Sequence, residues 1–143
     1  MKPQITVCFL LLLLGLYASA AAPDQDATLP LGHTKTISFV GPQTSEDAEV
    51  NPFTDYRLIV TFHHADTRQA VRGFYAADGD AAQSGASSGD IWKVRFAPDR
   101  IGTWTYSAEL RRGDSLAIDE RPDAGEIIEL QNPTGVFEVA ERL

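Results

Sequence analysis

Several short segments after residue 23 alternate apolar and polar residues with a period of two, the pattern of half-buried β-strands. The clearest segment is 56–63, where one strand face carries only large side chains: Tyr56, Leu58, Val60 and Phe62. The segment 91–96 repeats the alternation around Trp92 and leaves Lys93 and Arg95 on the solvent face. No segment beyond residue 23 shows sustained helical spacing. The pattern therefore predicts an all-β protein.

Turn-forming residues separate these segments from further candidate strands. We expect additional strands over residues 34–40, 70–77, 103–110, 125–130 and 135–140, with 115–118 as a candidate for a short eighth strand. Seven or eight short strands in a segment of this length are typical of an immunoglobulin-like sandwich of two antiparallel sheets. We assign this domain to residues 34–143.

Two of the expected connections are long. The first spans residues 41–55, and the second, 79–89, consists almost entirely of small residues. Long loops on a rigid scaffold often bind ligands, but a sequence rich in Gly, Ser and Ala is also typical of a plain connecting loop. The plain-loop interpretation is preferred.

The N-terminus has the three parts of a secretory signal peptide. Lys2 supplies the positive charge, residues 5–16 form an apolar run, and 18–20 read Ala-Ser-Ala, a small-residue cleavage signal. The apolar run is shorter than the roughly 20 residues of a membrane-spanning helix. We expect a signal peptide over residues 1–20, cleaved after residue 20 or 22, and a linker over 21–33. The mature protein is then secreted or periplasmic, with no membrane attachment.

Composition and charge narrow the class of protein. Removal of residues 1–20 leaves 123 residues, 11 basic and 20 acidic side chains, and no cysteine. A chain of this length can form one domain held by its hydrophobic core. The acidic surplus argues against nucleic acid and against an electrostatic membrane binder, because both reward clustered Lys and Arg.

The residues offer little for catalysis or metal binding. His63 and His64 are adjacent on a predicted strand, so they point to opposite faces and do not chelate one ion together. The sequence Asp78-Gly79-Asp80 contains oxygen ligands that suit calcium, but Asp-Gly is also a common turn, and the turn is preferred. No pair of acidic residues stands out as a glycosidase dyad. The sequence predicts no catalytic residues, no metal and no cofactor.

Aromatic residues are the more informative group. Exposed rings bind sugar faces in carbohydrate-binding modules, whereas a sandwich without disulfides also needs large core residues. Trp92 is expected in the core. The segment 99–106, which contains Asp99, Gly102, Trp104 and Tyr106, is similar to the aromatic corner that precedes an immunoglobulin strand. Candidate residues for contact with a glycan or a partner are Phe53, Phe74, Tyr75 and Asp78; Phe74 and Tyr75 point to opposite faces, so one of the two is expected to be exposed.

Five segments in succession resemble one known family. They are Phe39-Val-Gly-Pro42, Asn51-Pro-Phe-Thr-Asp-Tyr-Arg-Leu58, Gly73-Phe-Tyr-Ala-Ala-Asp-Gly79, the run from Gly89 to Asp99, and Gly102-Thr-Trp-Thr-Tyr106. Together they resemble the domain-of-unknown-function 5060 family over about residues 34–110. That family is the immunoglobulin-like module at the N-terminus of many secreted bacterial glycoside hydrolases. The resemblance implies an accessory module without catalytic residues of its own.

These observations give two principal hypotheses. The first is a non-catalytic module of a carbohydrate-active enzyme system that docks on a glycoside hydrolase catalytic domain, in the same chain or in another, or weakly contacts polysaccharide. The alternative is a secreted protein-interaction module unrelated to glycans. A small hydrolase is a remote third hypothesis. The 143 residues are too few for the (β/α)₈ barrel that usually follows this module, so we do not expect this chain to be an enzyme.

Overall fold

The computed structural model describes residues 28–142, and across them the chain forms nine β-strands and two short helical turns. The strands are β1 (Leu29–Pro30), β2 (Lys35–Ser45), β3 (Tyr56–His64), β4 (Thr67–Arg72), β5 (Phe74–Tyr75), β6 (Ser88–Phe96), β7 (Gly102–Arg112), β8 (Glu126–Ile128) and β9 (Thr134–Ala140). The helical turns are α1 (Ala81–Ser84) and the 3₁₀ turn Leu116–Ile118. The predicted signal peptide lies outside the described residues. No helix within 28–142 is long and apolar enough to cross a membrane.

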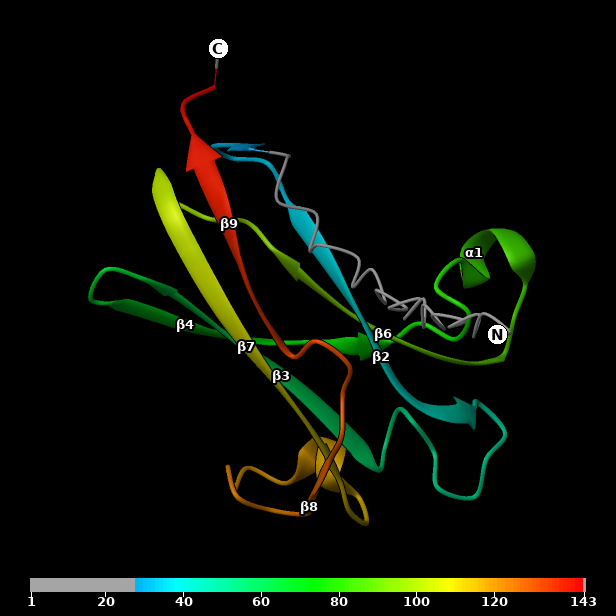
Figure 1. Cartoon of the computed structure of the whole chain (residues 1–143). Coiled ribbons are helices and arrows are strands. Elements are labelled where there is room, and N and C mark those ends of the chain that lie inside the picture. Colours follow the sequence, from blue (N-terminus) through cyan, green and yellow to red (C-terminus); the bar gives the residue numbers. More distant parts are fainter. Residues whose placement is uncertain (1–27, 143) are drawn as a thin grey trace, which may run out of the picture.

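The strands form two sheets that pack face to face (Figure 1). The six-stranded sheet has the order β1-β9-β7-β3-β4. Its sixth strand, β8, pairs with the C-terminal end of β7. The three-stranded sheet has the order β2-β6-β5. All pairings are antiparallel except that of β1 with β9. The predicted β-sandwich is thus confirmed.

The strand order is that of an immunoglobulin-like domain. In the usual lettering, β2, β6 and β5 correspond to strands B, E and D, and β9, β7, β3 and β4 correspond to G, F, C and C′. The parallel pair of β1 and β9 corresponds to strands A and G. β1 lies within the segment 21–33 that the sequence analysis assigned as a linker.

The core lies between the sheets and follows the predicted alternation. Tyr56, Leu58, Val60 and Phe62 of β3 are all buried. Phe62 stacks on Phe96 of β6 with ring centroids 3.9 Å apart, so the two sheets meet through aromatic rings. Trp92 of β6 is also buried, as expected.

An aromatic corner joins the two sheets where β6 leads into β7. Trp104 is fully buried, and its indole Nε1 donates a hydrogen bond to the carbonyl oxygen of Arg100 at 2.9 Å. In immunoglobulin domains a tyrosine at this place bonds to backbone a few residues upstream. Gly102 has a φ of +111°, which a glycine adopts without strain, and it brings the backbone against the ring of His64. Asp99 of the same motif is exposed in the turn.

The prediction of one strand over 70–77 was wrong, because the segment crosses from one sheet to the other at Gly73. β4 belongs to the six-stranded sheet and β5 to the three-stranded sheet. A Cβ atom on Gly73 would lie 2.4 Å from Leu58 Cδ2 and 2.6 Å from the carbonyl oxygen of Lys93. Only glycine fits such a close approach, and the crossing interrupts the strand.

Two other segments also differ from the sequence-based expectation. Residues 115–118 form a 3₁₀ turn and not a short strand, because Ser115 has a φ of +52° and the chain turns to bury the side chain of Leu116. The small-residue connection contains the single helical turn α1. β2 extends past the expected end to Ser45, with an irregularity in pairing between Val40 and Thr44.

Candidate functional site

The loop before β3 presents Phe53 to solvent, and its polar residues hold it in one shape. The side chain of Asn51 accepts a hydrogen bond from the backbone N–H of Phe53 at 2.9 Å and donates one to the carbonyl oxygen of Glu46 at 2.8 Å. The carboxylate of Asp55 accepts bonds from the backbone N–H groups of Asn51 and Ser115, and these bonds lower its pKa. Phe53 itself is 53% exposed. A side chain so exposed on a fixed loop is available for contact.

Phe74 and Tyr75 separate as the alternation predicted. Phe74 is 39% exposed, whereas Tyr75 is buried. The hydroxyl of Tyr75 lies 2.8 Å from the carbonyl oxygen of Thr44 and 3.2 Å from that of Gly89, and burial raises its pKa. Tyr75 is therefore a core residue whose edge supports Phe53, with ring centroids 5.9 Å apart.

Phe53 and Phe74 flank a small pocket of about 110 Å³ between the loop before β3 and the crossing at Gly73. Tyr56, Tyr75 and Trp92 are among the residues that line it. The guanidinium group of Arg95 lies over the ring of Phe74, with its Cζ atom 5.4 Å from the ring centroid. We call Phe53, Phe74 and this pocket the aromatic surface. The candidate residues Phe53 and Phe74 are exposed here, whereas Tyr75, a third candidate, is buried and does not present its ring to solvent.

Asp78 lies apart from the residues that line this pocket and acts within its own loop. Its carboxylate accepts hydrogen bonds from the Ser84 hydroxyl at 2.6 Å and the Asp80 backbone N–H at 2.9 Å, and these bonds lower its pKa. The carboxylate thereby ties the start of α1 to its end, the turn role that the sequence analysis preferred over calcium. Residues 28–142 contain no group of three or more His, Cys, Asp or Glu residues placed to hold a metal ion. His64 instead stacks on Trp104.

A larger groove lies on the solvent face of the six-stranded sheet. It has a volume of about 590 Å³ and is lined by outward-facing residues of β3, β4 and β7 and by residues of the connection between β7 and β8. Four arginines line it: Arg57, Arg68, Arg72 and Arg111. The volume falls within the range of small-molecule binding sites. We call it the arginine groove.

Arg57 forms one end of the arginine groove and is buried although it points outward from β3. Its guanidinium group donates to the carbonyl oxygens of Asp119 at 2.7 Å, Arg121 at 2.9 Å and Pro122 at 3.1 Å. Residues 119–122 therefore fold over the sheet and cover Arg57. The arginine has no ion-pair partner within the described residues, so its charge is balanced mainly by these carbonyl dipoles, and its charge also helps to lower the pKa of Asp119.

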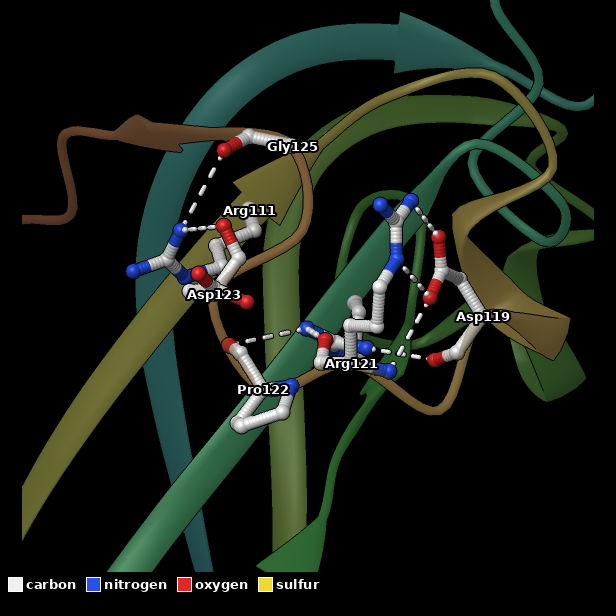
Figure 2. Close-up of polar contacts among 7 residues, drawn as sticks. Arg111, Asp119, Arg121, Pro122, Asp123 and Gly125 are labelled. Atoms are coloured by element: carbon white, nitrogen blue, oxygen red, sulfur yellow. Dashed lines mark hydrogen bonds and ion pairs between the residues drawn. The ribbon is translucent and has the colours of Figure 1, made fainter.

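Two further arginines fasten the same connection (Figure 2). Arg111 of β7 donates to the carbonyl oxygens of Asp123 at 2.9 Å and Gly125 at 3.2 Å. The side chain of Arg121 pairs with the carboxylate of Asp119 at 2.6 Å. That hydrogen-bonded pair and the backbone N–H of Arg121 lower the pKa of Asp119 to about 2. The connection is therefore held in place by hydrogen bonds along much of its length.

The arginine groove was not predicted from the sequence. Arg57 is the outward residue between Tyr56 and Leu58, and outward charged residues normally stay in solvent. Its carbonyl partners lie 62 to 65 residues further along the chain. The outward faces of the two predicted strands 56–63 and 103–110 each contain one charged residue, Arg57 and Glu109, so the local pattern did not indicate the groove.

Comparison with known proteins is consistent with the fold and identifies the family. The model of the family described as Domain of unknown function (DUF5060) matches residues 33–111, more than half of the chain. The protein belongs to this family. No match was found among the curated proteins.

One of the solved structures is similar in fold. It is titled as a "putative glycoside hydrolase" from Bacteroides vulgatus, with a TM-score of 0.50 and 22% sequence identity. The match covers 81% of this chain and 16% of that one. The present chain thus corresponds to a small part of that larger protein. The identity is low, so this likeness supports the fold alone.

Proposed function

We propose that this protein is a non-catalytic accessory module of a glycoside hydrolase system, and that it docks on the catalytic domain through the aromatic surface. The observation that carries the proposal is the exposure of Phe53 and Phe74, 53% and 39%, beside a pocket walled by buried aromatic rings. Aromatic residues with a rigid support are frequent anchors of protein interfaces. Membership of the family, whose resemblance implies a module of glycoside hydrolases, supports the association with these enzymes.

Docking on a protein fits this surface better than glycan stacking does. The pocket of about 110 Å³ is below the roughly 300 Å³ at which ligand sites usually begin, and suits one protruding side chain. Tyr56, Tyr75 and Trp92, which also line the pocket, are buried and therefore offer little ring surface to a sugar. Weak contact with polysaccharide through Phe53 and Phe74 is the second form of the proposal. The apolar N-terminal run, which has the features of a signal peptide, supports a location outside the cytoplasm in either form of the proposal.

The test begins with the genomic sequence beyond codon 143, which identifies the neighbouring catalytic domain. We expect a glycoside hydrolase domain there. Residues 21–143 and that domain are then mixed, and binding is measured by calorimetry. The double variant Phe53→Ser/Phe74→Ser is expected to weaken binding at least tenfold. The control is Ile101→Ser, which removes an apolar side chain of similar exposure, 48%, in the turn between β6 and β7.

Three results would overturn docking on a glycoside hydrolase. One is equal binding by the double variant, and another is no binding between the two proteins. The third is an unrelated protein in the neighbouring reading frame that binds this chain, which would favour a protein-interaction module without a glycan role. Affinity electrophoresis on a panel of neutral polysaccharides tests the second form of the proposal. If a polysaccharide retards the native protein and not the double variant, the aromatic surface binds glycan.

A further inference from the structure

The arginine groove concentrates positive charge in an acidic protein. The chain has a formal net charge of −8 with only 12 basic residues. Four of those residues line this one groove, and Arg121 lies in the connection that covers one end of it. Beyond the Debye length of about 8 Å at physiological salt, the acidic remainder of the protein is screened. The residues that line the groove carry four positive and three negative charges, so the groove has a net positive lining in a protein of net negative charge.

The acidic residues of the groove do not cancel this charge. Glu109 pairs with Arg111 at 2.5 Å, and Asp119 pairs with Arg121. Among residues 28–142 no carboxylate forms an ion pair with Arg57, Arg68 or Arg72. Glu120 is the remaining lining carboxylate. Two exposed arginines without an ionic partner, Arg68 and Arg72, thus share the groove with one such glutamate, whereas Arg57 is covered by residues 119–122.

The positions of the two exposed arginines are set by the sheet. Arg72 is the pairing partner of Ile59, and Arg68 is that of His63, so both arginines lie on the outward face of β4. Arg72 donates to the carbonyl oxygen of Ala117 at 2.8 Å, whereas Arg68 has no hydrogen bond within the described part of the chain. A strand rises about 3.3 Å per residue, so Arg68 and Arg72 stand roughly 13 Å apart along β4. This spacing suits a ligand with repeated negative groups.

We propose that the arginine groove binds an anionic polysaccharide through the carboxylates of its uronic acid residues. Arginine binds carboxylate through two parallel hydrogen bonds, which combine charge with a fixed geometry. The hydroxyl side chains of Thr61 and Ser107 also line the groove and match the hydroxyl groups of a sugar. No aromatic ring lines it, so stacking on neutral sugars plays no part.

The floor of the groove favours a saccharide over an acidic peptide. It is formed by β3 and β7, and each has a paired strand on both sides. Their backbone groups are occupied, so an extended peptide gains no strand pairing there. A ligand on this floor can therefore bond only to side chains. A uronic acid chain can bind in this way, because its carboxylates and hydroxyl groups bond to side chains.

The test is calorimetry of residues 21–143 with oligogalacturonates and with the same oligomers after methyl esterification, which removes the charge and keeps the backbone. We expect binding of the acidic oligomers, weaker binding as salt rises, and no measurable binding of the esters. Arg68→Gln/Arg72→Gln is expected to raise the Kd about tenfold or more, because charge-assisted bonds are the stronger ones. Arg68→Gln alone should raise the Kd by a smaller factor. Because the Arg68 side chain makes no hydrogen bond within the described residues, this change in Kd does not come from a folding defect.

Matched controls decide the outcome. Arg100→Gln removes one positive charge from the turn after β6 and should leave the Kd unchanged. Phe53→Ser/Phe74→Ser should also leave it unchanged, because neither ring lines the groove. Arg72 lines both the groove and the pocket of the aromatic surface, so Arg68→Gln, which affects the groove alone, distinguishes failure of this proposal from failure of the docking proposal. No binding of the acidic oligomers, equal binding of the esters, or equal binding by the double arginine variant would overturn the proposal. Equal or tighter binding of poly-L-glutamate would reassign the groove to an acidic protein segment.

Discussion

The rings of Phe39 on β2 and Tyr106 on β7 meet edge to face across the sandwich, with centroids 6.1 Å apart and planes inclined by 75°. In immunoglobulin domains a disulfide joins these two strands, and its second cysteine stands two residues after the corner aromatic residue. Tyr106 stands two residues after Trp104. In this protein an aromatic pair therefore occupies the place where related folds have a covalent link.

We expect Phe39 and Tyr106 to contribute a coupling energy beyond their separate burial. In a double-mutant cycle with Phe39→Leu and Tyr106→Leu, measured by urea unfolding, the coupling should be about 0.5–1.5 kcal/mol, the range for aromatic pairs of this geometry. Leucine keeps the site apolar and removes the ring. Additive effects, within about 0.3 kcal/mol, would show that the edge-to-face contact contributes nothing of its own.

The two tryptophans provide a matched pair for the corner hydrogen bond. Both are buried, at 0% exposure for Trp104 and 1% for Trp92. The Nε1 of Trp104 bonds to the carbonyl oxygen of Arg100, whereas the buried Nε1 of Trp92 has no partner within the described residues. Trp104→Phe should therefore lower the free energy of unfolding by about 1–3 kcal/mol more than Trp92→Phe, because only the first leaves a bonded carbonyl unpaired. Chemical denaturation of both variants measures the difference, and an equal loss would contradict the role assigned to the bond.

Alternation along the chain predicted the strands that form the core, because the period of two depends only on neighbouring residues. The segments 56–63 and 91–96 appear within β3 and β6 with the expected faces buried. The crossing at Gly73 depends on the approach of Leu58 and Lys93 from other strands, which no local pattern contains. Phe53 was predicted as a contact residue because an aromatic residue between Pro52 and Asp55 stands in a loop. The burial of Arg57 was not predicted, since it requires a connection from more than 60 residues away.

Arg57 should stabilise the connection that covers it. Arg57→Met keeps a long side chain and removes the donors to the carbonyl oxygens of Asp119, Arg121 and Pro122. We expect a loss of about 2–3 kcal/mol in the free energy of unfolding, as for hydrogen bonds to a charged group. Faster hydrogen exchange should be confined to the amides of residues 116–125. The control Arg68→Met, at an exposed site without such bonds, should change stability by less than about 0.5 kcal/mol. Unchanged exchange in Arg57→Met would show that the other bonds of the connection, such as those from Arg72 and Arg111, hold it without Arg57.

Asp119 should make the stability of the protein fall at low pH. Its pKa in the folded state is about 2, lowered by the hydrogen-bonded Arg121 side chain, whereas the ordinary value is 3.8. A lowered pKa means that the carboxylate favours the folded state above the unfolded pKa, and that this contribution disappears as the pH falls from about 4 to about 2. In Asp119→Asn the contribution is absent at every pH. The melting temperatures of the two proteins should therefore differ at pH 6 and converge toward pH 2. Asp55 and Asp78, whose pKa values are also lowered, act equally in both proteins and cancel in the comparison. If the difference between the two melting temperatures stays constant from pH 6 to pH 2, Asp119 acts through its shape and not through its charge.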